Sequence, residues 1–202
     1  LWKLIISEFI SKFKFYNIDY ATELNLIKYG FFLKSSKLIL NERLGVSLGI
    51  RVDQDNFTSD NNILSNFSPR LALSYGLSKD NNWMLNFSSG VYFKIPTYTA
   101  LGFKDSHNNL INKDLLYTKS HHYVLGIEFN SSSSSRFTVE SFYKMYYNYP
   151  ISVIDNVSLA NKGADFEVLG NELLLSKGKG KSHGLEFLYQ QKLKNNFYAI
   201  SK

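Results

Sequence analysis

NNWMLNFSSGVYFKI, residues Asn81–Ile95, alternates between apolar and polar side chains along almost its whole length. From Trp83 onward every second residue is large or apolar, with Ser89 as the exception. Side chains two residues apart share a face only in a β-strand, so the stretch predicts a strand with one apolar and one polar face. This strand spans thirteen residues, whereas the usual strand has roughly 5–6.

The composition excludes several classes of protein. The chain has 202 residues, of which 44% are hydrophobic, enough for one sizeable domain. It contains no Cys, which excludes a disulfide scaffold and a Cys-based metal site. No apolar run approaches the roughly 18 residues of a membrane-spanning helix. The net charge is +6, but the lysines are scattered rather than clustered on one helix face, so we predict no nucleic-acid partner.

Five further stretches repeat the alternation of the first: Arg43–Asp53, Arg70–Ser78, His121–Asn130, Arg136–Tyr147 and His183–Leu193. An earlier stretch, Thr22–Lys37, is similar but less regular. Eleven charged residues of the six regular stretches share the polar face: Arg43, Arg51, Asp53, Arg70, Lys94, Glu128, Arg136, Glu140, Lys144, Glu186 and Lys192. Chance would place about half of them on each face, so the apolar faces exclude charge.

The connections between these strands alternate in length. The long ones are Gln54–Pro69, Pro96–Ser120 and Asn148–Ser182, and the short ones are Lys79–Asn82, Ser131–Ser135 and Lys194–Asn196. Outer-membrane barrels have short periplasmic turns at one rim and long extracellular loops at the other. The pattern therefore places the segments around Asn61, His107 and Lys162 outside the cell, and Asp80 and Ser133 in the periplasm.

Aromatic residues mark both ends of the apolar faces. Trp83, Phe137 and Phe197 follow the short turns, whereas Phe93 and Tyr147 stand near the opposite ends. Two such belts are typical of the interfaces of a membrane barrel. We predict an all-β fold: a section of an antiparallel up-and-down transmembrane β-barrel, incomplete and therefore a curved meander sheet.

The order of several segments resembles the barrel of a TonB-dependent outer-membrane receptor of the Bacteroidota type. The segments that carry the resemblance are FSPRLALSYGLSKDNNWMLNFSSGVYFKIPTYTALGF, NKDLLYTKSHHYVLGIEF, RFTVESFYKMYYNYPISV, LANKGADFEVLGNE and GKGKSHGLEFLYQQKLKNNFY. The resemblance implies a barrel in the bacterial outer membrane that surrounds a plug domain, is energised by the TonB protein, and imports a siderophore, haem, cobalamin or an oligosaccharide. We expect residues 1–202 to form part of this barrel domain, without the plug domain or the C-terminal strands. The implied partners are outer-membrane lipid, the plug, TonB and a small-molecule or glycan ligand.

Ligand contacts are expected on the polar face and in the loops near the extracellular rim, where Tyr and Phe rings can stack on a ligand. The candidates are Tyr92, Lys94, Tyr98, Phe103, His122, Tyr146 and Asn148. The charges lining the lumen, Arg51, Asp53, Arg70, Glu128, Glu140 and Glu186, are expected mainly to pair with one another or with the plug.

We predict no catalytic residue, metal site or cofactor. Adjacent histidines on a strand, such as His121 and His122, point to opposite faces and cannot chelate one ion. The segment GKGKS (Gly178–Ser182) lacks the first glycine of a phosphate-binding loop, since Leu175 stands there. Ser182 and His183 have no third group to form a triad. A passive porin, a secreted β-rich carbohydrate-binding module and, least of all, an enzyme barrel stay open as alternatives.

Overall fold

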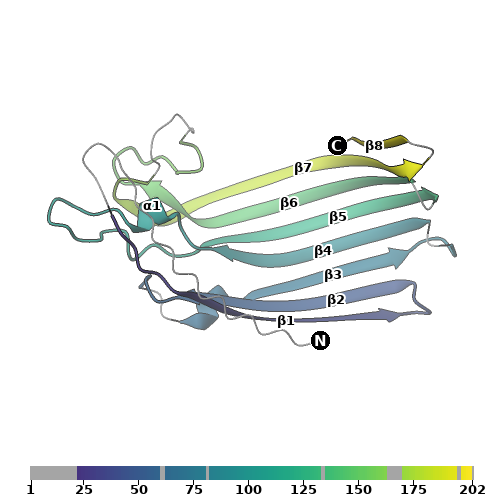
Figure 1. Cartoon of the computed structure of the whole chain (residues 1–202), viewed down its shortest axis with the longest axis horizontal. Coiled ribbons are helices and arrows are strands. Elements are labelled where there is room, and N and C mark those ends of the chain that lie inside the picture. Colours follow the sequence, from purple (N-terminus) through teal and green to yellow (C-terminus); the bar gives the residue numbers. More distant parts are fainter. Residues whose placement is uncertain are drawn as a thin grey trace.

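The chain forms one antiparallel sheet in which every strand pairs with its neighbours in the sequence (Figure 1). The computed structural model describes residues 22–59, 62–80, 82–132, 135–162, 170–194 and 197–201. The eight strands are β1 (Lys28–Ile39), β2 (Leu44–Asp55), β3 (Ser68–Gly76), β4 (Trp83–Lys94), β5 (Thr118–Ser132), β6 (Ser135–Ser152), β7 (Leu174–Lys194) and β8 (Phe197–Ser201). The sheet is curved and does not close, because β1 and β8 remain its two edges. This confirms the predicted all-β meander.

The predicted boundaries are furthest from the structure in two regions. The sheet begins at Lys28, and residues 22–27 precede it without strand structure. The connection predicted for Asn148–Ser182 is only 153–173, because β6 continues to Ser152 and β7 starts at Leu174. The alternation is interrupted at Asn148, whose φ of 58° is left-handed, and the register shifts between Tyr146 and Tyr149. A bulge of this kind breaks the period of two without ending the strand.

Long and short connections alternate as predicted, and β1 and β2 add a further short turn at residues 40–43. The long connections gather at one end of the sheet, called here the loop rim (Figure 1). They include η1 (Ile63–Asn66) and α1 (Tyr98–Leu101). The opposite end, with the short turns, is called the turn rim. No helix within the described ranges is long and apolar enough to cross a membrane.

The register places the aromatic residues in two rows on one face, called here the outer face. At the turn rim Trp83, Phe129, Phe137 and Tyr189 are direct cross-strand partners. Towards the loop rim Phe93 and Tyr147 flank Lys119 in one row. Trp83 and Phe93 are ten positions apart in β4, which at roughly 3.3 Å per residue and a tilt of about 40° gives ~25 Å, the height of the apolar band in outer-membrane barrels. The side chain of Phe197 lies outside the described residues.

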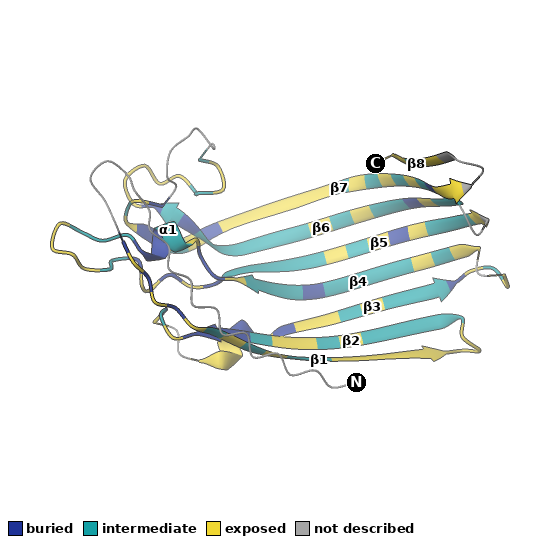
Figure 2. Ribbon diagram, viewed as in Figure 1, coloured by how far each residue is buried: buried dark blue, intermediate teal, exposed yellow. Residues whose placement is uncertain are grey.

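Between the two rows the outer face is apolar and exposed. Leu48, Leu125, Leu185 and Phe187 are 53–64% exposed, and Figure 2 shows the strands as exposed or intermediate over most of their length. All carboxylates of the described strand residues lie on the other, inner face, as the pairings of Asp53, Asp55, Glu128, Glu140 and Glu186 show. The predicted division of the strands into an apolar face and a face with the carboxylates is thus confirmed.

The buried apolar cluster lies among the loops at the loop rim rather than against the sheet (Figure 2). It consists of Leu24, Leu26, Ile95, Ala100, Leu101, Leu115, Tyr117 and Leu174. The buried carboxylate of Asp55 joins this cluster to β2, because it accepts hydrogen bonds from the Tyr117 hydroxyl at 2.9 Å and from the Thr58 amide at 2.6 Å. Burial and this carboxylate raise the pKa of Tyr117. The loops at the loop rim therefore enclose a buried core of their own.

Candidate functional site

A stack of cationic and aromatic side chains lies on the inner face near the loop rim. The guanidinium carbon of Arg70 is 4.4 Å from the centre of the Tyr92 ring, and the His122 ring is 4.5 Å away on the other side. Arg70 and His122 are both cross-strand partners of Gly90. The Tyr92 ring lies over Gly90, where an added Cβ would be only 3.0 Å from the ring. The missing side chain of Gly90 thus makes room for the stack.

The stack continues onto β6. Tyr146 meets His122 edge-on at 6.4 Å, and Tyr149 meets Tyr146 edge-on at 6.3 Å. Tyr146 pairs with Gly180 and Tyr149 with Gly178, so both tyrosines are on the inner face although three positions separate them. Asn148 has left-handed backbone and forms a bulge there. The bulge adds one extra residue to β6, so that Tyr149 returns to the same face as Tyr146. We call Arg70, Tyr92, His122, Tyr146 and Tyr149 the aromatic row.

The charges around the aromatic row are mostly positive. Within the described part of the chain Arg70 and Lys94 form no ion pair. By contrast, Arg51 is held by two oxygens of Asp53 at 2.6 and 2.7 Å, and Arg136 lies 3.6 Å from Glu128. The expectation that lumen charges pair with one another is confirmed for these two pairs. Unpaired cations beside aromatic faces favour an anionic ligand with flat rings.

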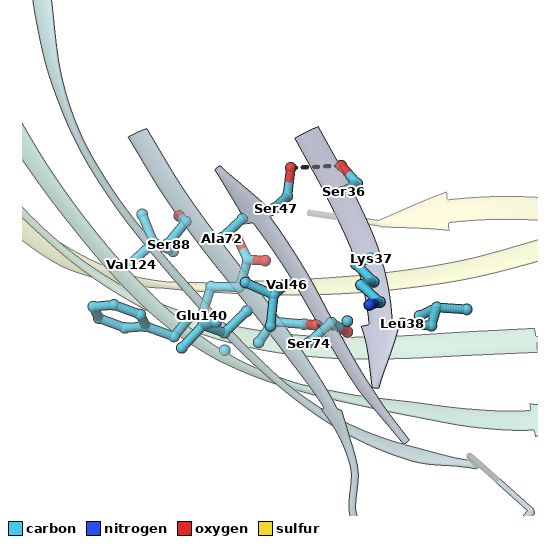
Figure 3. Close-up of a pocket in the computed structure, with 15 residues that line it drawn as sticks. Ser36, Lys37, Leu38, Val46, Ser47, Ala72, Ser74, Ser88, Val124 and Glu140 are labelled. Atoms are coloured by element: carbon cyan, nitrogen blue, oxygen red, sulfur yellow. Dashed lines mark hydrogen bonds between the residues drawn. The ribbon is translucent and has the colours of Figure 1, made fainter. Parts of the chain in front are cut away.

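Hollows adjoin the row on both sides. One of about 440 Å³ is bordered by Arg51, Arg70 and Tyr92, and another of about 390 Å³ by Tyr146, Tyr149 and Asn161. A third, of about 400 Å³, lies closer to the turn rim (Figure 3). It is lined mostly by small residues, among which the Ser36 hydroxyl donates a hydrogen bond to the Ser47 hydroxyl at 2.9 Å. Lys37 and Glu140 are the charged residues of its lining. The aromatic row is therefore the better-equipped surface for ligand contacts.

The structure brings together three of the seven predicted site residues: Tyr92, His122 and Tyr146. Lys94 lies two residues beyond Tyr92 on the same face, where it pairs with Thr118. Asn148 forms the bulge in β6, and its side-chain amide donates a hydrogen bond to the Tyr117 carbonyl at 3.4 Å.

Tyr98 and Phe103 lie in the loop around α1, where Tyr98 packs against the buried cluster. Both residues are in the connection between β4 and β5 and not on the strands that carry the aromatic row. The sequence identified Arg70 only as a lumen charge and missed Tyr149. Its inner position depends on the bulge, and the one sequence signal was Asn148, because Asn is enriched in left-handed backbone.

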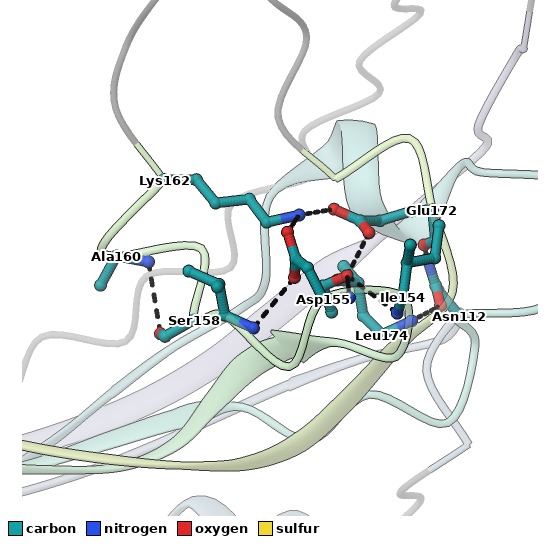
Figure 4. Close-up of polar contacts among 10 residues, drawn as sticks. Asn112, Ile154, Asp155, Ser158, Ala160, Lys162, Glu172 and Leu174 are labelled. Atoms are coloured by element: carbon teal, nitrogen blue, oxygen red, sulfur yellow. Dashed lines mark hydrogen bonds and ion pairs between the residues drawn. The ribbon is translucent and has the colours of Figure 1, made fainter.

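The loop between β6 and β7 is closed by Lys162, whose ammonium contacts Asp155 at 2.9 Å and also Glu172 (Figure 4). The Lys162 ammonium and the Val157 amide hold the pKa of Asp155 down to about 2. Glu172 and Asp155 in turn raise the pKa of Lys162. Asn112 ties this loop to the preceding one, because its side chain donates to the Glu172 carbonyl at 2.8 Å and accepts from the Leu174 amide at 3.0 Å.

The histidines point in the directions expected from their parity. His121 pairs with Val91 and Met145 on the outer face, whereas His122 faces inward. Ser182 and His183 likewise lie on opposite faces, because they pair with Lys144 and Tyr143. In the part of the chain that the structure describes, no group of three His, Asp or Glu side chains is placed to hold a metal ion.

Comparison with known proteins agrees with this architecture. A family model described as "TonB dependent receptor-like, beta-barrel" matches residues 14–200. A search of curated proteins found no match.

Three solved structures from Pseudomonas aeruginosa are similar to the chain. For the siderophore receptor PirA the TM-score is 0.59 at 17% identity, over 86% of this chain and 30% of that one. For a mutant of the ferric enterobactin receptor PfeA these values are 0.60, 19%, 88% and 26%. For a PfeA mutant in complex with enterobactin they are 0.58, 19%, 87% and 26%.

At these identities the likeness shows the fold alone, and the chain spans only about a quarter to a third of the length of those receptors. The family model and these structures do not support the narrower Bacteroidota type. The family consists of outer-membrane receptors and transporters rather than enzymes. Because the family model covers nearly the whole chain, the chain belongs to the TonB-dependent receptor family as a section of its β-barrel.

Proposed function

We propose that this barrel section belongs to a receptor that imports a scarce nutrient, and that its ligand is an anionic chelate with flat aromatic rings, such as a ferric catecholate siderophore. The aromatic row carries the proposal. Arg70 and Lys94 supply positive charge, and Tyr92, Tyr146 and Tyr149 supply ring faces on the same surface. The siderophore receptors among the structural neighbours are consistent with this ligand class.

The intact receptor would supply what a barrel wall alone does not. We propose that its partners are outer-membrane lipid, its own plug domain and the energy-coupling TonB protein. No catalytic residue, metal or cofactor has a part in this function. Membership of the family makes a passive porin and a secreted carbohydrate-binding module weaker explanations. An oligosaccharide is also weaker as cargo, because Arg70 and Lys94 form no ion pair among the described residues and a neutral sugar would give them no counter-charge.

The test is ligand affinity in the intact receptor, with ferric enterobactin as the probe and quenching of intrinsic fluorescence as the readout. Arg70→Gln should weaken binding about tenfold, since it removes the positive charge that meets the anionic ligand, and a hydrogen bond to a charged group contributes roughly 1.5–3 kcal/mol. Arg136→Gln is the matched control, because Arg136 also faces inward but lies at the turn rim beside Glu128. Equal effects of the two substitutions, or tighter binding of a neutral oligosaccharide than of the chelate, would contradict the proposal.

A further inference from the structure

His122 is the member of the aromatic row whose charge changes near neutral pH. An imidazole ordinarily titrates near pH 6.5, whereas the tyrosines of the row titrate near pH 10 and its arginine stays charged. The chain has four histidines. His121 and His183 pair with residues of the outer face, and His107 lies in the connection between β4 and β5. Between pH 8 and pH 6 the charge of the row therefore changes at His122.

The strands on both sides present rings and cations to His122. On β4 the Tyr92 ring is 4.5 Å away, and Arg70 of β3 stacks on the same Tyr92 ring at 4.4 Å. On β6 the cross-strand partner of His122 is Lys144, and Tyr146 meets the imidazole edge-on at 6.4 Å. Protonation of His122 thus places a further cation between two that are always charged.

No carboxylate of the neighbouring described strands offsets such a charge. On β6 the first inward carboxylate towards the turn rim is Glu140, whose partner Gly126 is four positions from His122 along β5. Towards the loop rim the inward residues of β5 and β6 include no Asp or Glu, and the inward residues of β4 include none along the whole strand. No ion pair within the described ranges involves His122. The counter-charge for a protonated imidazole must therefore come from a ligand or from solvent.

We propose that His122 takes up a proton when the anionic ligand binds, so that affinity rises as the pH falls from 8 to 6. The inference rests on the proposed function, because it assigns the regulation of the same site. In the empty receptor Arg70 and Lys144 repel an imidazolium, whereas an anion within about 4–6 Å stabilises it. A proton and a ligand that favour each other in this way strengthen each other's binding by the same factor.

The experiment measures the affinity of the intact receptor for ferric enterobactin at pH 8 and pH 6 by quenching of intrinsic fluorescence. The wild type should bind about fivefold more tightly at pH 6, since an opposite charge at this distance shifts a pKa by about one unit or more. His122→Phe keeps a ring against Tyr92 but takes up no proton, so its affinity should change by less than about twofold between the two pH values.

Proton uptake is measured directly by calorimetry at pH 6.5 in buffers of different ionisation enthalpy. The wild type should take up about half a proton more per bound ligand than His122→Phe does. His122→Gln, which also takes up no proton, should behave as His122→Phe does. Heat-modifiable migration on gels identifies the folded fraction of each variant.

His121→Phe is the matched control, because His121 is the adjacent residue of β5 but faces outward, where it pairs with Val91 and Met145. It should keep the pH dependence of the wild type. Protonation of the ligand itself is common to all the proteins and cancels in the comparison. The inference alone is overturned if His122→Phe keeps the wild-type pH dependence, or if the wild type binds equally tightly at both pH values. A wild type that binds no chelate at either pH would overturn the proposed function and this inference with it.

Discussion

The guanidinium carbon of Arg70 lies 4.4 Å from the centre of the Tyr92 ring, and the ring reaches this position by lying across Gly90. The pairing of β3 with β4 does not by itself explain this contact. Arg70 pairs with Gly90 rather than with Tyr92, so the ring fills the place that a side chain at residue 90 would occupy. The geometry of the proposed ligand surface therefore depends on a glycine, because it has no side chain of its own in that place.

This dependence predicts the effect of adding one methyl group. In Gly90→Ala the new Cβ would meet Tyr92 at 3.0 Å, which displaces the ring from Arg70 and His122. We expect affinity for ferric enterobactin to fall about tenfold in the intact receptor, because the displaced ring no longer presents its face to the ligand and an aromatic contact is worth roughly 0.5–1.5 kcal/mol. In Gly180→Ala the nearest atoms of Tyr146 are 3.9 Å away, and affinity should stay within about twofold. Equal losses in both variants would show that ring placement is not what matters.

The facing of β2 predicts a large difference between adjacent residues. Leu48→Arg places a charge on the outer face within the apolar band and should cost about 2–4 kcal/mol of folding free energy in lipid vesicles. Ser47→Arg points inward, where Ser47 contacts Ser36, and should cost much less. Urea titration of the intact receptor in vesicles measures both. Similar costs for the two substitutions would mean that the assignment of the faces is wrong.

Loop length predicts the orientation in the membrane. His107 and Lys162 belong to long connections at the loop rim, whereas Asp80 belongs to a short turn. An epitope inserted at His107 or Lys162 should be labelled by antibody on intact cells, and one at Asp80 only after permeabilisation. Labelling of Asp80 on intact cells would reverse the orientation.

The contacts of Lys162 predict a pH-dependent loop. The pKa of Asp155 lies at about 2, below its usual 3.8, so the stabilisation by Lys162 is fully present above pH 3.8 and is lost as the pH falls towards 2. Pepsin cleavage within residues 153–162, followed by mass spectrometry, should therefore increase between pH 4 and pH 2. Lys162→Met should be cleaved readily at pH 4 already, whereas Lys104→Met, in the neighbouring loop, should behave as the wild type. A wild-type loop cleaved equally at both pH values would contradict the role of this ion pair.

The regular strands were predictable because each face meets one environment over many residues. The alternation of Arg43–Asp53 or Trp83–Ile95 follows directly from that constraint. It fails where local geometry changes the period. The bulge at Asn148 and the glycines at 178 and 180 remove the alternation, so the sequence alone predicts a loop where the structure has the upper parts of β6 and β7.

The site was less predictable than the fold. Parity correctly placed Tyr92, His122 and Tyr146 on one face, and the register then brought them together. The contact of Arg70 with Tyr92 depends on a ring lying across a neighbouring glycine, which no sequence period encodes. Tyr98 and Phe103 belong to a loop whose position depends on packing at the loop rim, including Asn112 and its bonds to Ala100 and Glu172.

The most direct test of the account is a cysteine scan of β4 in the intact receptor, because β4 decides the fold. Cysteines at Leu85, Phe87 and Val91 should carry a fluorophore that is quenched by brominated lipid and should resist a water-soluble maleimide. Cysteines at Asn86 and Ser88 should show the reverse, since these positions face inward. A pattern with period two would confirm a wall between lipid and lumen. Uniform reactivity with maleimide along β4, without quenching by lipid, would contradict it.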